Sequence, residues 1–104
     1  MKLENKQGIT NITFKPKAVC FCPLGDDWYT NEFEIFMSVG EWFPDYCDIE
    51  KYLNENIRGK SLIIEDATRS LYNHINAEYK PGFLEVISRV NDAASHSPVE
   101  VKIV

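Results

Sequence analysis

Residues 31–39 read NEFEIFMSV, and this stretch decides the fold class because its hydrophobicity alternates with a period of two. Phe33, Ile35 and Met37 occupy every second position. Side chains of a β-strand point alternately to its two faces, so these three residues share one face. The pattern predicts a strand that buries one face against a core.

The segment before this strand, residues 8–20, is also rich in apolar and β-branched residues, and it predicts a further strand. Pro16 has no backbone N–H, which indicates an edge strand or a bulge near that position. Gly25, Asp26 and Asp27 between the two segments are typical of a turn. The first third of the chain is therefore predicted to be a hairpin.

After residue 44 the period changes from two to the helical spacing. Residues 45–58 predict a helix, with Asp45 or Asp48 as a cap or charge of the first turn and Gly59 at its end. The apolar positions that share one face are Ile49, Tyr52, Leu53 and Ile57.

Ser61 is expected to cap a longer second helix that runs to about Tyr79. Pro81 and Gly82 then stop this helix. Its apolar stripe, which predicts packing on a sheet, contains Ile64, Thr68, Leu71, Tyr72, Ile75 and Tyr79.

The last quarter of the chain returns to a period of two over residues 84–90 and 99–103, which predicts a second hairpin. The order ββααββ in 104 residues favours a single α+β domain, with a four-stranded antiparallel sheet and both helices on one face. Phe36 and Ile87 would lie on the opposite face. Exposed apolar residues and open sheet edges there predict a homo-oligomer that closes the sheets into a barrel.

The composition restricts the location and the partners of the chain. A net charge of −5 with scattered basic residues argues against direct binding of nucleic acid. The sequence contains no signal peptide and no membrane span, so we expect a cytoplasmic protein without a membrane partner. Three cysteines without a secretory signal predict reduced thiols.

Residues 20–30, CFCPLGDDWYT, concentrate the reactive side chains. Cys20 and Cys22 form C-x-C rather than C-x-x-C and lack paired zinc ligands, so neither a metal site nor a thioredoxin-like pair is expected. Cys20 is expected to pack in the strand. Cys22 and Asp27 are either turn residues or a nucleophile with its proton donor.

Glu65 and Trp28 each have two interpretations, whereas the two histidines have one. Glu65 lies in the first turn of the second helix, where an acidic residue favours the helix dipole, but its carboxylate could instead accept two N–H groups of a purine. Trp28 either packs in the hairpin or stacks on a heterocycle. His74 and His96 have no partner at catalytic or metal spacing and are expected on the surface.

The order of elements and three separated motifs resemble a known family. Cys22-Pro-Leu-Gly-Asp-Asp-Trp28, Ile64-Glu-Asp66 and Tyr79-Lys-Pro-Gly-Phe-Leu-Glu-Val86 resemble QueF, the NADPH-dependent 7-cyano-7-deazaguanine reductase of the tunnelling-fold (T-fold) superfamily, and the QueF-like proteins. The resemblance implies that Cys22 adds to a nitrile as a thioimide, that Asp27 donates the proton and that Glu65 anchors the purine. It also implies ligand sites at subunit interfaces.

The sequence departs from this family at the cofactor motif. Asp45-Tyr-Cys-Asp-Ile-Glu-Lys-Tyr52 stands in its place and has lost basic residues at Cys47 and Glu50, and Ile64 replaces the catalytic His. NADPH is therefore implied by the resemblance but disfavoured by these residues. Two functions follow: a nitrile reductase or related thioimide-forming enzyme of queuosine-type tRNA base biosynthesis, or a non-reducing protein that binds purines or pterins or serves assembly. A third hypothesis is a small protein-interaction module.

Overall fold

The computed structural model describes residues 3–104 and contains two helices and seven strands within that range. The elements in chain order are β1 (Leu3–Glu4), β2 (Asn11–Phe14), β3 (Lys17–Cys22), β4 (Asp27–Ser38), β5 (Trp42–Phe43), α1 (Tyr46–Asn56), α2 (Ile64–Tyr79), β6 (Leu84–Val90) and β7 (Val99–Ile103).

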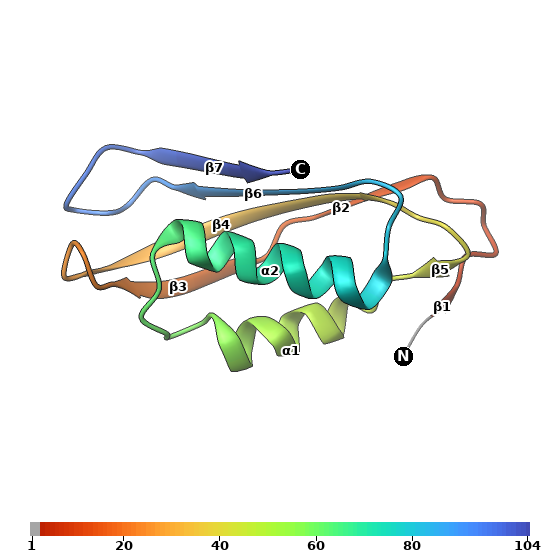
Figure 1. Cartoon of the computed structure of the whole chain (residues 1–104), viewed down its shortest axis with the longest axis horizontal. Helices are drawn as coiled ribbons and strands as arrows, with labels where there is room; N and C mark the ends of the chain where they lie inside the picture. Colours follow the sequence, from red (N-terminus) through yellow and green to blue (C-terminus); the bar gives the residue numbers. More distant parts are fainter. Residues whose placement is uncertain (1–2) are drawn as a thin grey trace.

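The main sheet is antiparallel and has β4 and β6 at its centre, with β2 and β3 on one side and β7 on the other. β2 and β3 pair with β4 in a continuous register, so they are two parts of one edge strand and the sheet is four strands wide. Both helices lie on one face of this sheet (Figure 1). The predicted α+β fold with ββααββ order is confirmed.

Pro16 explains why the edge strand is divided. The backbone N–H of Phe33 donates to the Pro16 carbonyl at 2.9 Å, but proline has no N–H with which to return the second bond of this pair. The prediction of a single strand over residues 8–20 is therefore wrong in its bounds, since regular pairing begins at Asn11, is interrupted at residues 15–16 and ends at Cys22. The predicted edge position is confirmed.

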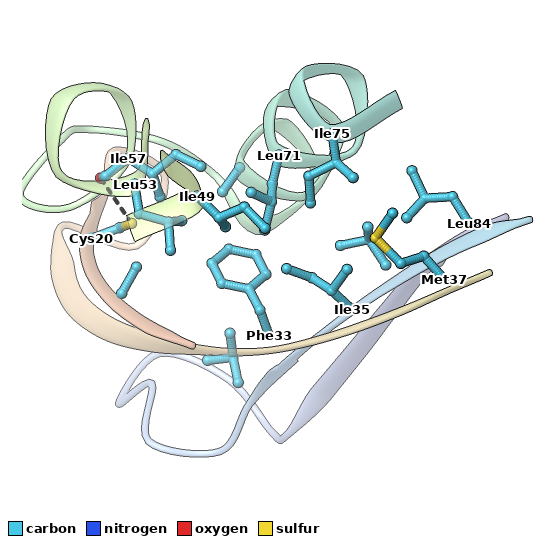
Figure 2. Close-up of a cluster of buried hydrophobic side chains, with 14 of the residues drawn as sticks. Cys20, Phe33, Ile35, Met37, Ile49, Leu53, Ile57, Leu71, Ile75 and Leu84 are labelled. Atoms are coloured by element: carbon cyan, nitrogen blue, oxygen red, sulfur yellow. Dashed lines mark hydrogen bonds between the residues drawn. The ribbon is translucent and has the colours of Figure 1, made fainter. Parts of the chain in front are cut away.

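The core lies between the sheet and the two helices. Figure 2 shows Phe33, Ile35 and Met37 pointing from the sheet toward the helix side chains, which confirms the face predicted from their alternation. Burial of apolar surface of this kind is the main favourable term in folding. The helix residues that meet them and are completely buried are Ile49, Leu53, Leu71 and Ile75.

The helix boundaries agree with the sequence at three of four ends. Asp45 caps α1, because its side chain accepts the N–H groups of Cys47 and Asp48. Ser61, however, is not the cap of α2, which begins at Ile64 without a side-chain cap. The segment before it is held extended along the free edge of β3: Phe21 donates to the Lys60 carbonyl and accepts from the Leu62 N–H.

Phe36 and Ile87 lie on the outer face of the sheet, as predicted. Ile87 is only 7% exposed within the single chain, and Phe36 packs edge-to-face on Phe83 with ring centroids 5.8 Å apart. Both side chains are thus covered, Ile87 almost fully and Phe36 in part, within one chain. The surrounding positions are charged and form ion pairs that join Lys17 to Glu32, Arg89 to Glu34 and Glu100, and Lys102 to Glu85.

A short ribbon formed by β1 and β5 was not predicted, because two residues per strand give no periodic signal. It lies at the end of the molecule opposite the β3–β4 hairpin tip (Figure 1). Within residues 3–104, no helix combines the length and the apolar character needed to cross a bilayer.

Candidate functional site

A cavity of about 400 Å³ lies where the β3–β4 hairpin tip, the first turn of α2 and the β6–β7 loop meet. This volume is within the range of small-molecule sites. Its lining is mainly apolar with a few polar groups, and consists of Cys22, Leu24, Gly25, Tyr29, Ile63, Ile64, Glu65, Val90, Ser95, His96 and Val99.

Cys22 ends β3 and lies on the same face of that strand as Cys20, with Phe21 on the other face. The hairpin turn then folds over it, and the N–H of Gly25 approaches its Sγ at 3.4 Å. The side chain is partly exposed and lines the cavity. A thiol in this position can reach a bound molecule, whereas Cys20 cannot.

Glu65 is the second residue of α2 and lines the same cavity. Its neighbour Asp66 is also exposed, but it is not among the lining residues. The structure therefore brings Cys22 and Glu65 to one cavity although 42 positions separate them in the sequence. The helix start favours a negative charge here, and the carboxylate is also available to accept hydrogen bonds.

Asp27 lies opposite Cys22 in the hairpin but outside the cavity lining. Its two carboxylate oxygens accept backbone N–H groups, one from Trp28 at 2.8 Å and one from Ala94 at 2.9 Å. The second bond joins the hairpin to the β6–β7 loop. The prediction that Asp27 donates a proton to a ligand remains a prediction, and its position supports a part in holding the loop.

Trp28 points to the outer face of the sheet rather than into the cavity. It is 54% exposed and packs edge-to-face on Phe21 at 5.4 Å between ring centroids. The sequence contained a signal for this placement, because Trp28 has the same parity as Glu32 and Glu34 in the alternating pattern. That signal was missed because the strand was expected to begin at residue 31 rather than at Asp27.

Sequence reasoning missed Ser95 and His96, which line the cavity from the β6–β7 loop. His96 is exposed, as expected, yet it belongs to the cavity lining. A loop between two strands has no periodicity from which its position could be inferred. Gly25 fits closely against this loop, since a Cβ at that position would be 2.5 Å from Ser95 Oγ.

Cys20 belongs to a closed network in the core. Its Sγ donates to the Ile57 carbonyl at 3.3 Å and receives the Asn31 amide at 3.4 Å, while Ser88 donates to Asn31 at 2.7 Å. Burial raises the pKa of the Cys20 thiol, which the hydrogen bond from Asn31 opposes. The prediction that Cys20 packs in the strand is confirmed.

No family model and no curated protein matches the sequence. Among solved structures, the crystal structure of the archaeosine synthase QueF-like in its apo form superposes with a TM-score of 0.81. The alignment covers 92% of this chain and 93% of that chain at 16% sequence identity.

The chain has the fold of QueF-like archaeosine synthase. The resemblance predicted from the sequence is therefore confirmed for the fold. At 16% identity, the likeness concerns the arrangement of the backbone and not the ligand or the reaction.

In this QueF-like fold, the residues at the place of the family's cofactor motif do not suit the phosphates of a nicotinamide cofactor. Asp45 uses its carboxylate to cap α1, and Glu50 pairs with Arg58 at 2.6 Å. Tyr79 donates to the Asp48 carboxylate at 2.8 Å. Asp45 and Asp48 at the start of α1 therefore place negative charge where an anionic group would have to bind, whereas the charge of Glu50 is balanced by Arg58.

His74, in the second half of α2, packs against the start of α1; it was expected on the surface but is half-buried. Its ring stacks on Tyr52 with centroids 4.0 Å apart, and its Nε2 lies 3.2 Å from Asp48. Partial burial favours a higher pKa for Asp48, but hydrogen bonds from Tyr79 and His74 outweigh it and lower the pKa. Among residues 3–104, no three His, Cys, Asp or Glu side chains are placed to share a metal ion.

Proposed function

We propose that this protein forms a thioimide with the nitrile group of a 7-deazapurine, with Cys22 as the nucleophile and Glu65 as the purine anchor. The observation that carries the proposal is the position of both side chains on one cavity of about 400 Å³. A bicyclic purine analogue fits sites of this size. The fold supports the proposal only as an analogy, since folds host unrelated functions.

The proposed reaction is the addition of the Cys22 thiol to the nitrile carbon. A carbon–sulfur bond forms, one π bond of the C≡N group is converted to an N–H bond, and the thiol proton goes to the nitrile nitrogen. No atom leaves, and nothing is oxidised or reduced. Holding the nitrile carbon near the sulfur makes the step effectively unimolecular.

Glu65 is proposed to orient the purine for this addition. Its carboxylate offers two oxygens to the neighbouring N–H groups on the edge of a guanine-type base, and such charge-assisted pairs are directional. The apolar remainder of the lining, such as Ile63, Ile64 and Val90, suits the faces of the heterocycle. Cys22 would then meet a substituent on the opposite side of the ring system.

The start of α1 bears on the proposed fate of the thioimide, because it stands where the family has its cofactor motif. Because the carboxylates of Asp45 and Asp48 do not suit a phosphate-bearing hydride donor, no reduction by NADPH is proposed. The proposal is that an amine adds to the thioimide carbon and expels the Cys22 thiol, which gives an amidine. The amine supplies the new C–N bond, and the thiol is regenerated.

One observation favours the alternative of a protein that binds deazapurines, purines or pterins without turnover. Both oxygens of Asp27 accept backbone N–H groups, so the predicted proton donor is engaged outside the cavity. Under this alternative, Glu65 holds the ligand and Cys22 only contacts it. Covalent capture distinguishes the two functions.

The test is intact-mass spectrometry of the protein after incubation with 7-cyano-7-deazaguanine. The expected result is a mass increase equal to the whole nitrile compound, lost in Cys22→Ala. Cys47→Ala is the matched control, since Cys47 is exposed and does not line the cavity, and it should form the adduct as the unmodified protein does. An unmodified mass at saturating ligand would contradict the proposal and leave the binding alternative.

Assembly with further copies of the chain is also proposed. β7 forms one border of the described sheet, and no other strand of residues 3–104 pairs with its outer edge. Open edges commonly pair with a neighbouring chain. Light scattering coupled to gel filtration tests this point, and a monomeric mass at micromolar concentration would contradict it.

A further inference from the structure

Two carboxylates attach the β6–β7 loop to the β3–β4 hairpin: Asp92 belongs to the loop, and Asp27 belongs to the hairpin. Asp92 accepts the backbone N–H of Thr30 at 2.9 Å and its hydroxyl at 2.7 Å. Asp27 accepts the N–H of Ala94 at 2.9 Å, and Gly25 leaves room for Ser95. These contacts hold the next residue, His96, at the cavity that Cys22 also lines.

The hydrogen bond of His96 defines the tautomer of its neutral ring. Its Nδ1 lies 2.7 Å from the Ser97 carbonyl oxygen, which can only accept a hydrogen bond. Nδ1 therefore carries the hydrogen, and Nε2 is the nitrogen with a free lone pair. His96 lines the same cavity as Cys22, and a base that can reach a thiol is the arrangement by which enzymes activate a cysteine.

We infer that His96 is the proton-transfer residue of the cavity and that Asp27 is a positioning residue that holds its loop. The inference rests on the proposed nitrile addition. Nε2 of His96 takes the proton of the Cys22 thiol as the carbon–sulfur bond forms. The same proton then passes from Nε2 to the nitrile nitrogen, so His96 returns to its neutral form and no co-reactant is needed.

The other titratable groups at this cavity are less suited to the transfer. The hydroxyl of Tyr29 donates to the Leu62 carbonyl, and burial raises its pKa, so it stays protonated. Glu65 comes from α2 and is assigned to the purine edge. Asp27 accepts two backbone N–H groups and lies outside the lining. Of these groups, only His96 offers a neutral nitrogen with a free lone pair that can accept the thiol proton and then return it.

The test compares the rate of adduct formation with 7-cyano-7-deazaguanine in two variants. His96→Ala should slow the addition by about 100-fold, which is typical for loss of a general acid–base group. Asp27→Asn, which keeps a side-chain acceptor, should slow it by less than about 10-fold. The opposite order, with Asp27→Asn inactive and His96→Ala unaffected, would overturn the inference and restore Asp27 as the proton donor.

Two readouts separate a chemical role from a structural one. Imidazole added to His96→Ala should restore at least about one tenth of the lost rate, because small bases can substitute for a missing side chain at an exposed position. Iodoacetamide should alkylate Cys22 more slowly in His96→Ala than in the unmodified protein, while Cys47 is alkylated equally in both. Equal alkylation of Cys22, or no rescue, would overturn the inference.

The alkylation result does not depend on the nitrile. If no nitrile adduct forms but alkylation of Cys22 still responds to His96→Ala, the proposed function fails and the Cys22–His96 proton transfer stands. Thermal unfolding of each variant, expected within a few degrees of the unmodified protein, confirms that the fold is kept.

Discussion

Cys20 and Cys22 lie two residues apart on the same face of β3, but their surroundings differ. Cys20 is completely buried, and its thiol is bonded to the Ile57 carbonyl and the Asn31 amide. Cys22 borders a cavity of about 400 Å³ with Glu65 and His96 around it. Two adjacent positions on one face of β3 therefore lie in different surroundings: Cys20 in a closed hydrogen-bond network and Cys22 at a cavity.

The difference follows from what covers each position. The end of α1 and the loop after it lie over Cys20, whereas the start of α2 and the β6–β7 loop leave a space over Cys22. In the described residues, no buried side-chain polar atom lacks a hydrogen-bond partner. Satisfied buried groups stabilise one arrangement, and groups that line a cavity are available to a ligand.

The largest expected difference is in thiol reactivity. A thiol reagent such as iodoacetamide should modify Cys22 and Cys47 in the folded protein, with Cys20 modified more than about 1,000-fold more slowly because it reacts only after unfolding. Peptide mapping after timed quenching measures all three sites in one sample. Comparable labelling rates of Cys20 and Cys22 would show that the two thiols are equally accessible in the folded protein, which would contradict the comparison.

A substitution in the closed network should reduce stability. Asn31→Ala leaves the Ser88 hydroxyl without its acceptor and creates a void, so we expect a loss of about 2–4 kcal/mol in the free energy of unfolding by urea. Asn91→Ala is the matched control on an exposed loop and should change stability by less than about 0.5 kcal/mol. A similar loss of stability in the two variants would contradict the claim that the buried network stabilises the fold.

A substitution at the open cavity should reduce binding instead. Measured by calorimetry in a Cys22→Ala background, Glu65→Gln should weaken binding of the deazapurine by about 10- to 100-fold through loss of a charge-assisted pair. Asp66→Asn removes the neighbouring charge outside the lining and should alter binding by no more than about 2-fold. Equal losses would indicate a general charge effect rather than a purine anchor.

The smallest expected effect concerns the attachment of the β6–β7 loop. The backbone and side-chain hydrogen bonds of Thr30 lower the pKa of Asp92. A carboxyl group whose pKa is lower in the folded state stabilises above its unfolded pKa of about 4, and this contribution is lost as the pH falls through the folded value. Asp92→Asn should therefore cost less than about 1 kcal/mol at pH 7, with the difference disappearing in acid.

Urea unfolding of both proteins between pH 2 and pH 7 measures this dependence. A difference between Asp92→Asn and the unmodified protein that persists unchanged at the lowest pH would show that the Asp92–Thr30 contact does not act through the ionised carboxylate.

The fold was largely predictable because its signals are local. The alternation over residues 31–39 marked the central strand, and Asp45 marked the start of α1. Ser61 misled because the residues around it pair with the distant edge of β3, which no local pattern reveals. Backbone pairing between remote segments overrides a capping preference worth about 1 kcal/mol.

The site was predictable where it lies on regular elements. Cys22 ends a strand and Glu65 begins a helix, so the order of elements was enough to bring them to one end of the sheet. His96 lies in a loop whose position depends on contacts from Asp27 and Asp92 to the hairpin and the loop backbone. Those contacts exist only in the folded chain, so no pattern in the sequence placed His96 at the cavity.

The most direct test of the central claim is a crystal structure of the protein soaked with 7-cyano-7-deazaguanine. We predict continuous electron density from Cys22 Sγ to the former nitrile carbon, with the Glu65 carboxylate within hydrogen-bond distance of the purine N–H groups and Cys20 unmodified. A ligand bound away from this cavity, or one in the cavity whose nitrile is not bonded to Cys22, would contradict the claim.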